Sequence, residues 1–444
     1  GMVAVVCLHS TVAYMTVRMQ DLPWPIHDKS AAGFFDLVFI GIQGFAMPLF
    51  FLIAGFCAVR LAESGGIGGF MKNRLRRILV PFLAGCALVL PLIYFIWAYG
   101  WLRSGACEMA EILKVKFADP LLRRNCYGPA HLWFLEYLLI DCGIFAAARW
   151  VMSRWNFLRG PERLWGSAAA GRLFRSQWKV LFFAPLTAGI FYLSPGAMIG
   201  FKNSFLPDLF RLLHYLVFFT FGAWLNVFAR DLRALSGGAL RYLVLSAILL
   251  HPTACLVRVA VLNPLEGRSL VLFAFCAAFF CWFLVLGLLG LSLRYADRQS
   301  RAASHLAKAS YWVYLVHLPV LGLLQIAVAE FVWSAAFKFA AVTAGTLALC
   351  LLSYRLVLGR GRPFEARLLC AILYLLFAGW LAIKGQSIYR QEKDRCRDVI
   401  GGFYRTYLRR EPDPGGLEYW TGLAADKWGL RKVERIGFVD TKEI

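Results

Sequence analysis

Long apolar runs recur along this chain and are separated by shorter polar or charged stretches. A helix needs about 20 mainly apolar residues to cross the hydrocarbon core of a bilayer, and the runs match or approach that length. We expect spans near residues 1–18, 34–60, 77–99, 131–148, 180–199, 212–228, 240–263, 269–293, 309–329, 334–358 and 368–385. Backbone polar groups in lipid must be satisfied within the segment. The pattern therefore predicts an all-α fold, a polytopic transmembrane helix bundle of about 10–11 spans.

The pattern changes at residue 386, where the chain becomes polar, charged and rich in turn residues. The stretch GGFYRTYLRREPDPGGLEYWTGL (401–423) predicts a helix, a turn at EPDPGG and a second helix. Its expected core comprises Phe403, Tyr407, Leu417 and Trp420. The stretch resembles a short bacterial domain of unknown function marked by R-E-P-D-x-x-G-L-x-Y-W, for which glycan binding and a packing or oligomerisation role both remain open. We divide the chain into an integral-membrane domain (1–385) and a small helical extracytoplasmic domain (386–444).

Composition and charge agree with a membrane protein. Of the 444 residues, 60% are hydrophobic and 17% are charged, whereas soluble domains carry about 25% charged residues. The net charge of +22 is explained by the positive-inside rule, which places Lys and Arg in cytoplasmic loops. Basic loops such as 60–77 and 149–179 predict a cytoplasmic N-terminus and an external C-terminal domain, although the expected external loop 100–130 is also basic. No basic region stands outside the loops between spans, so we expect no nucleic-acid partner.

Two histidines inside the spans are candidates for function, because ionisable groups in lipid are costly and usually used. His9 lies about halfway along the first span. His317 lies about 12 Å into the ninth span, which enters from the same side, so the two rings are expected at similar depth. Tyr314 precedes His317 by three residues and shares its helix face. The alternative is that each histidine bonds a carbonyl of a neighbouring helix.

Three further candidates lie at the outer end of the fourth span, in HLWFLEYLLI (131–140). His131 marks the external mouth, and Glu136 lies about 7 Å deeper on another face of the helix. Glu136 could serve the site or could pair with Arg258 in a purely structural contact. Trp133 could bind an acceptor or anchor the helix at the membrane interface.

The cluster MKNRLRRILVP (71–81) precedes the third span. It is either a topology signal or a phosphate clamp, since Arg74 and Arg77 lie one α-helical turn apart and guanidinium groups bind phosphate by paired hydrogen bonds. Pro48 is expected to kink the second span.

The chain has twelve cysteines, most of them inside the spans. Cys107, Cys126 and Cys396 are expected in water, and Cys107 and Cys126 share the external loop, where an oxidising exterior could join them in a disulfide. No pattern of closely spaced Cys and His in the sequence suggests a zinc site, so we expect no metal.

Five elements, in order, resemble the membrane-bound acyltransferase 3 family, which includes glucan-modifying and sugar O-acetylating enzymes. The likeness extends from about residue 1 to 360. VVCLHS resembles the first-span motif that ends in the family's key histidine, here His9. The others are MPLFFLIAGF, NRLRRILVPF, HLWFLEYLL and YWVYLVHLP.

The resemblance implies a bacterial inner-membrane enzyme that moves an acetyl or succinyl group from cytoplasmic acyl-CoA to a hydroxyl of an extracytoplasmic carbohydrate, such as a polysaccharide, glucan or lipopolysaccharide. His9 would be the catalytic base, with Glu136 and His317 also in the catalytic set. Arg74, Arg76 and Arg77 would hold the phosphates of acetyl-CoA or succinyl-CoA, and His131, Trp133 and Tyr314 would meet the acceptor. The alternative function is a transporter or flippase for a glycan or lipid-linked substrate, although we see no repeated halves.

The chain departs from the family pattern at two places. The family's serine in F-F-x-x-S-G-F is Ala54 here, so no hydroxyl can act at that point. The family's arginine eleven residues before its histidine would precede Gly1, so we expect the chain to be inactive unless another group compensates.

Overall fold

The computed structural model describes residues 1–19, 22–154, 166–199, 202–229, 231–295, 301–358 and 364–440, with only the backbone described at 199, 301–303, 358 and 364–384. Every regular element in these ranges is a helix, which confirms the predicted all-α fold. The chain forms two compact units. One comprises Gly1–Pro91 and Tyr127–Cys350, and the other comprises Leu92–Cys126 and Leu351–Ile444.

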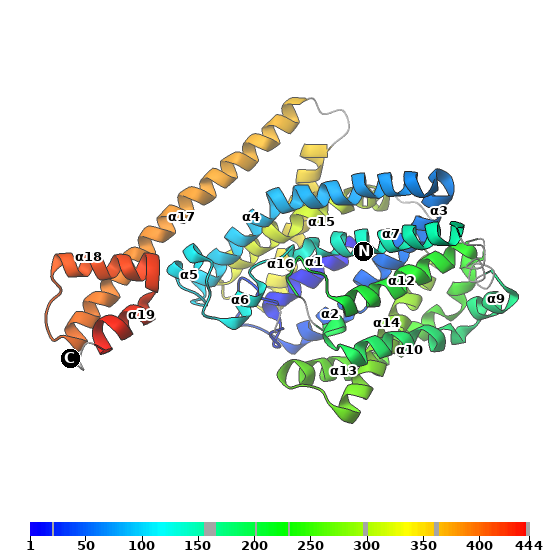
Figure 1. The fold of residues 1–444 in the computed structure, drawn as a ribbon, viewed down its shortest axis with the longest axis horizontal. Helices are drawn as coiled ribbons and strands as arrows, with labels where there is room; N and C mark the ends of the chain where they lie inside the picture. Colours follow the sequence, from blue (N-terminus) through cyan, green and yellow to red (C-terminus); the bar gives the residue numbers. More distant parts are fainter. Residues whose placement is uncertain are drawn as a thin grey trace. The chain divides into compact units, whose positions relative to one another are not determined.

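The first unit consists of long helices joined by shorter ones (Figure 1). They are α1 (Met2–Thr11), η1 (Val12–Tyr14), α2 (Gly33–Gln43), α3 (Ala46–Arg74), η2 (Leu75–Leu79), η3 (Ala130–Leu132), α7 (Trp133–Arg154), α9 (Ala168–Arg175), η5 (Gln177–Lys179), α10 (Val180–Leu193), α11 (Gly196–Ile199), α12 (Leu209–Val227), η6 (Leu232–Gly238), α13 (Ala239–Leu262), α14 (Gly267–Tyr295) and α15 (Arg301–Val328). Two helices, α4 (Val80–Arg103) and α16 (Ala335–Leu358), run from one unit into the other.

Seven helical stretches in the described residues are long and apolar enough to cross a membrane: Gly33–Arg103, Ala130–Arg154, Leu209–Val227, Leu232–Leu262, Gly267–Tyr295, Ser304–Val328 and Ala335–Val357. They contain eight of the expected spans, because 34–60 and 77–99 both fall within Gly33–Arg103. The expected span 1–18 is a shorter apolar helix, Met2–Tyr14. The expected span 180–199 forms α10, of 14 residues, followed by α11. The polytopic helix bundle is confirmed, while the expected span 368–385 lies where side chains are not described.

The expected kink of the second span at Pro48 is present: the helix is interrupted between α2 and α3 at Gly44 and Phe45, and Pro48 lies in the first turn of α3. A proline ring clashes with the carbonyl four residues before it, here that of Gly44, so the helix breaks one turn ahead of the proline. A Cβ at Gly44 would come within 2.4 Å of the Phe280 ring, so the break falls where only glycine fits beside α14.

Helices α3 and α12 cross with their backbones in close contact. A Cβ on Gly55 would lie 1.9 Å from the Phe219 carbonyl oxygen, and a Cβ on Gly222 would lie 1.9 Å from the Leu52 carbonyl oxygen. Small residues at such crossings let membrane helices approach and gain packing energy. The glycine of MPLFFLIAGF therefore serves the crossing of α3 and α12.

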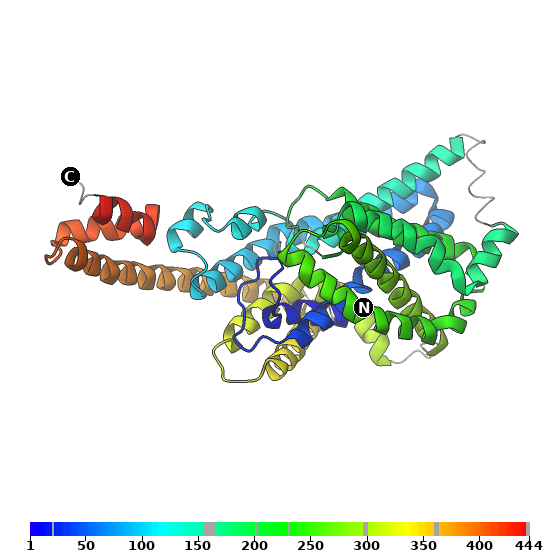
Figure 2. The same ribbon diagram turned by 90° about the horizontal axis from the view of Figure 1, so that it is seen from below.

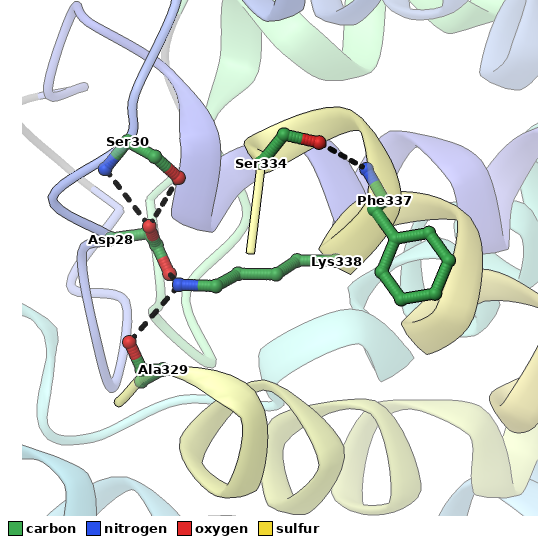
Figure 3. Close-up of polar contacts among 6 residues, drawn as sticks. All are labelled: Asp28, Ser30, Ala329, Ser334, Phe337 and Lys338. Atoms are coloured by element: carbon green, nitrogen blue, oxygen red, sulfur yellow. Dashed lines mark hydrogen bonds and ion pairs between the residues drawn. The ribbon is translucent and has the colours of Figure 1, made fainter. Parts of the chain in front are cut away.

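The loop between η1 and α2 is held by a buried ion pair (Figure 3). Lys338 Nζ of α16 lies 2.7 Å from Asp28 Oδ2, and both side chains are 3% exposed. The backbone N–H and hydroxyl of Ser30 also donate to Asp28, and Lys338 donates to the Ala329 carbonyl oxygen. The ion pair thereby ties this loop to the N-terminal end of α16.

The environment of Asp28 determines how this contact depends on pH. Burial opposes ionisation, but hydrogen bonds from Lys338 and Ser30 and the charge of Lys338 outweigh it, so the Asp28 pKa lies below its ordinary value of 3.8. A lowered pKa in the folded state stabilises the fold at pH above the ordinary value. That contribution is lost only as the pH falls through the folded-state pKa, below 3.8.

The elements of the second unit include a compact C-terminal group of helices. They are α5 (Met109–Lys114), α6 (Pro120–Asn125), α17 (Phe364–Tyr407), α18 (Pro414–Gly422), η7 (Leu423–Trp428), α19 (Leu430–Glu434) and η8 (Arg435–Val439). Figures 1 and 2 both show the short C-terminal helices against the end of α17. Their core is centred on Ile400, Val433 and Phe438, which are fully buried. The four expected core residues 403, 407, 417 and 420 pack around this centre and are partly buried.

The predicted Cys107–Cys126 disulfide is wrong, since both residues are free thiols. Cys126 ends α6 and its thiol donates to the Arg123 carbonyl oxygen. The expectation that Cys107, Cys126 and Cys396 lie in water is also wrong, because all three are buried in the second unit, at 5–7% exposure. Contacts between the segment that carries Cys107 and the C-terminal helices that carry Cys396 bury these two residues, and sequence spacing does not reveal such contacts.

We predict that Lys338→Met lowers the stability of the protein by about 3–5 kcal/mol, because it leaves Asp28 buried without its counter-ion. The double variant Asp28→Leu/Lys338→Met should be close to wild type, since replacing both charges with apolar groups removes the desolvation cost. Thermal unfolding of the purified protein in nanodiscs measures both. A double variant as unstable as the single one would contradict the ion-pair explanation.

Candidate active site

Three histidines from distant parts of the chain meet in the first unit. His9 comes from α1, His131 from η3 and His317 from α15. The centre of the His317 ring lies 5.0 Å from that of His9 and 5.1 Å from that of His131. His317 is fully buried, His131 is 4% exposed, and His9 is half-buried. The expected meeting of His9 and His317 is present, and His131 joins them.

A directional chain of hydrogen bonds assigns the proton positions on two of these rings. Nδ1 of His317 lies 2.8 Å and 3.1 Å from the carbonyl oxygens of Tyr314 and Val313. Carbonyl oxygens only accept, so Nδ1 carries the proton and Nε2 of a neutral His317 is an acceptor. Nδ1 of His9 lies 2.8 Å from that Nε2 and must donate to it. The lone pair of His9 is therefore on Nε2, the nitrogen that can accept a proton.

The third ring is held by the same helix. His131 Nε2 lies 3.2 Å from the Leu315 carbonyl oxygen, so it donates there. Its Nδ1 then carries a lone pair, and that atom is buried with no hydrogen-bond partner among the described residues. The Tyr314 hydroxyl donates to the His131 carbonyl oxygen over 2.6 Å. Tyr314, predicted to meet the acceptor, thus fixes η3 and its histidine.

Two residues that the sequence reasoning missed support His9. The Trp24 ring stacks parallel to the His9 ring, with centroids 6.0 Å apart. Trp24 Nε1 donates to Gln325 Oε1 over 2.7 Å, and Gln325 Nε2 donates to the Ser10 carbonyl oxygen over 3.0 Å. Gln325 is 1% exposed, and its amide joins the loop, α15 and the residue next to His9. In the sequence, Gln325 is the lone side-chain amide in the apolar span 309–329, and this feature could have identified it as a candidate.

The arginine cluster lies at a change of helix type. After Arg74 the helix widens into a π-helix, η2, which contains Arg76 and Arg77. Such single π-turns are frequent at functional sites. The Tyr311 hydroxyl of α15 donates to the Arg77 carbonyl oxygen over 3.0 Å. Arg76 and Arg77 are exposed, whereas Arg74 is half-buried beside the Phe70 ring. The α-helical spacing assumed for Arg74 and Arg77 is therefore replaced by a wider turn.

The structure does not bring Glu136 and Trp133 into the histidine cluster. Glu136 lies near Cys86 of α4, and its Oε2 is buried with no hydrogen-bond partner in the described part of the chain. The alternative pairing with Arg258 is therefore not formed at that oxygen. Trp133 packs against Tyr137 and Tyr215, with ring centroids 5.3 Å and 5.4 Å apart. A further carboxylate of α7, Asp141, is fully buried and has neither oxygen paired within the described ranges.

This arrangement supports acid–base chemistry by an imidazole. In the described residues no group of three His, Cys, Asp or Glu side chains is placed to hold a metal ion. A neutral imidazole with a free Nε2 can remove the proton of a hydroxyl nucleophile.

Comparison with protein families identifies the chain. The family model described as an acyltransferase domain (Acyl_transf_3) matches residues 1–355. Comparison with curated proteins and with solved structures finds no match. Members of the matched family are O-acyltransferases, which decides for an enzyme over a transporter. The chain belongs to this membrane acyltransferase family and is an enzyme that transfers acyl groups to carbohydrate hydroxyls.

Proposed function

We propose that the donor is a cytoplasmic acyl-CoA, acetyl-CoA or succinyl-CoA, and that the acceptor is a carbohydrate outside the bacterial inner membrane. The observation that supports this best is the lone pair on His9 Nε2, which the bond from His9 Nδ1 to His317 leaves free. A sugar hydroxyl is a weak nucleophile, and a positioned base accelerates its attack by about 10²–10⁴.

The proposed reaction is one transfer with two proton movements. His9 Nε2 takes the hydroxyl proton while the oxygen attacks the thioester carbonyl, giving a tetrahedral intermediate. The C–S bond then breaks, and the imidazolium returns the proton to the thiolate, which leaves as the free thiol. The charge that forms on His9 is stabilised through Nδ1–H by His317.

The arginines Arg74, Arg76 and Arg77 are suited to bind the phosphates of the acyl-CoA donor. CoA carries several phosphate charges, and guanidinium groups bind phosphate with paired hydrogen bonds. Arg76 and Arg77 are exposed on the π-turn, which is helical and belongs to the basic segment expected on the cytoplasmic side. The bond from Tyr311 to the Arg77 carbonyl ties this turn to α15, the helix that carries His317. Arg74 is half-buried, and it would bind a phosphate of the donor through the accessible side of its guanidinium group.

Contacts in the second unit support an extracytoplasmic C-terminal domain. The Leu430 N–H donates to Glu108 Oε2 over 2.9 Å, and Lys114 donates to the Lys427 carbonyl oxygen. Segments in direct contact in water lie on one side of a membrane. The 100–130 loop and the 386–444 domain therefore share a side, as the predicted topology requires, despite the basic residues of that loop.

We predict that His9→Ala lowers acyl transfer by a factor of about 10²–10⁴ while the protein still folds, because it removes the base. Thermal stability should fall, since His317 Nε2 loses its hydrogen-bond partner. Transfer of radiolabel from acetyl-CoA and from succinyl-CoA to cell-envelope polysaccharide, in membranes containing the full chain, measures the activity. His317→Leu should lose less activity, since the base stays but loses the acceptor that orients it.

The matched control is His251→Ala, which removes an exposed histidine of α13 and should retain wild-type transfer. Wild-type turnover by His9→Ala would remove this residue from the mechanism. Label transfer by the wild-type protein from an acyl donor other than a CoA thioester, with none from acetyl-CoA or succinyl-CoA, would contradict the proposed donor class.

We predict that Arg76→Ala and Arg77→Ala each raise the KM for acetyl-CoA by about 10-fold or more with little change in kcat, because a hydrogen bond to a charged group contributes about 1.5–3 kcal/mol. Initial rates at varied acetyl-CoA concentration provide the measurement. Arg268→Ala, which removes the same charge from a loop expected outside, is the control and should leave KM unchanged. A lowered kcat at unchanged KM would argue against phosphate binding.

A further inference from the structure

The second unit contains a cavity that the transfer chemistry does not use. It has a volume of about 670 Å³ and lies between the 105–120 segment and the C-terminal helices. Sites for small molecules and cofactors usually measure about 300–1,000 Å³. The match to the acyltransferase family ends at residue 355, so one wall belongs to the matched region and the other follows it.

The two walls are joined by specific contacts. The Glu108 carboxylate accepts from the Leu430 N–H at the start of α19. Gly429, just before it, has a φ of +77°, and a Cβ there would lie 1.8 Å from Glu108 Oε2. Only glycine fits both the left-handed backbone and the approach of the carboxylate. Together with the bond from Lys114 to the Lys427 carbonyl, these contacts form the cavity without a ligand.

The base of the cavity is apolar and unreactive. Cys107, Cys396, Ala424 and Ala425 line it and are all less than 9% exposed. Burial raises the pKa of Cys107 to about 12 and that of Cys396 to about 11. Both groups are therefore neutral thiols at physiological pH and act as small apolar side chains. Thiolate chemistry is not expected of this wall.

The acidic side chains of the rim are already used by the protein. Glu111 accepts from the N–H groups of Glu108 and Ala118. Asp119 accepts from the first N–H groups of α6, and Glu392 lies 3.5 Å from Arg395. Because their charges are engaged by the protein, these carboxylates do not form a site for a free cation.

The basic side chains balance the acidic ones. Arg395, Arg431 and Lys432 line the cavity together with four carboxylates, Glu108, Glu111, Asp119 and Glu392. The lining has almost no net charge, which disfavours phosphates, polyanions and basic peptides, since those are drawn by a surplus of the opposite charge. It does offer many donors and acceptors at short range. Such a lining suits an uncharged ligand with many hydroxyl groups.

An aromatic wall completes the set. The half-buried Trp428 indole lines the cavity, packs on the domain core and has the Lys432 ammonium 5.2 Å from its ring centre. Tryptophan combines a large apolar face with a polar edge, and the C–H face of a sugar ring packs on such a surface while its hydroxyls bond to neighbouring polar groups.

We propose that this cavity binds an uncharged stretch of the carbohydrate acceptor and holds the polymer at the enzyme. This proposal rests on the proposed function, which supplies two premises: the side of the membrane on which the cavity lies and the class of acceptor. Its role is binding, separate from the proton transfer at His9. The C-terminal domain then contributes to acceptor affinity and not to the chemical step.

The test is binding of the purified full-length protein, in nanodiscs, to a glycan array that carries neutral and anionic bacterial oligosaccharides. We expect binding to at least one uncharged oligosaccharide, weakened about fivefold or more by Trp428→Ala. Lys432→Ala, an exposed change that leaves the core intact, should weaken it in the same direction. Tyr419→Ala removes an aromatic of the same domain that is 61% exposed and outside the cavity, and it should bind as wild type does.

Failure of this inference can be told apart from failure of the proposed function. His9→Ala should bind glycans normally, because binding does not need the base. Glycan binding without label transfer from any acyl-CoA would leave the cavity proposal standing and overturn the transfer proposal. Absence of binding to every glycan, binding only to anionic glycans, or equal binding by wild type, Trp428→Ala and Lys432→Ala would overturn the cavity proposal.

Discussion

A hydrogen bond between two imidazole rings, from His9 Nδ1 to His317 Nε2, determines what the candidate site can do. Polar groups buried in a helix bundle must find partners, because an unpaired one costs several kcal/mol. His317 satisfies its own Nδ1 on carbonyls of α15, which leaves Nε2 as an acceptor and sets the direction of the next bond. His9 is thereby held as a neutral ring with Nε2 available as a base.

The same helix, α15, connects the other parts of the site. Tyr311 bonds the π-turn that carries the arginines, Tyr314 bonds the backbone of His131, and Gln325 bonds the backbone beside His9. The loop that carries Trp24 is held in turn by Gln325 and by the Asp28–Lys338 pair. A shift of α15 would therefore alter the donor end, the acceptor end and the base together.

Much of this could be predicted from the sequence, and the exceptions have physical reasons. The fixed rise of a helix gives the depth of a residue in a span, so the level of His9 and His317 could be predicted. The contact of Trp24 with Gln325 could not, because it joins a loop to a helix across 301 positions. The π-turn at Leu75–Leu79 depends on tertiary packing and backbone register, which leave little trace in composition. For Glu136 the sequence predicted the position within the span but not its surroundings, in which Oε2 is buried without a hydrogen-bond partner among the described residues.

The tautomer of His9 is the most direct measure of this arrangement. Solid-state ¹⁵N NMR of the histidine-labelled protein in bilayers at neutral pH, with the His9 signals identified by their loss in His9→Ala, distinguishes protonated from unprotonated ring nitrogens. The structure predicts a neutral His9 ring with the proton on Nδ1 and a lone pair on Nε2. A His9 ring protonated on Nε2, whether neutral or doubly protonated, would contradict it.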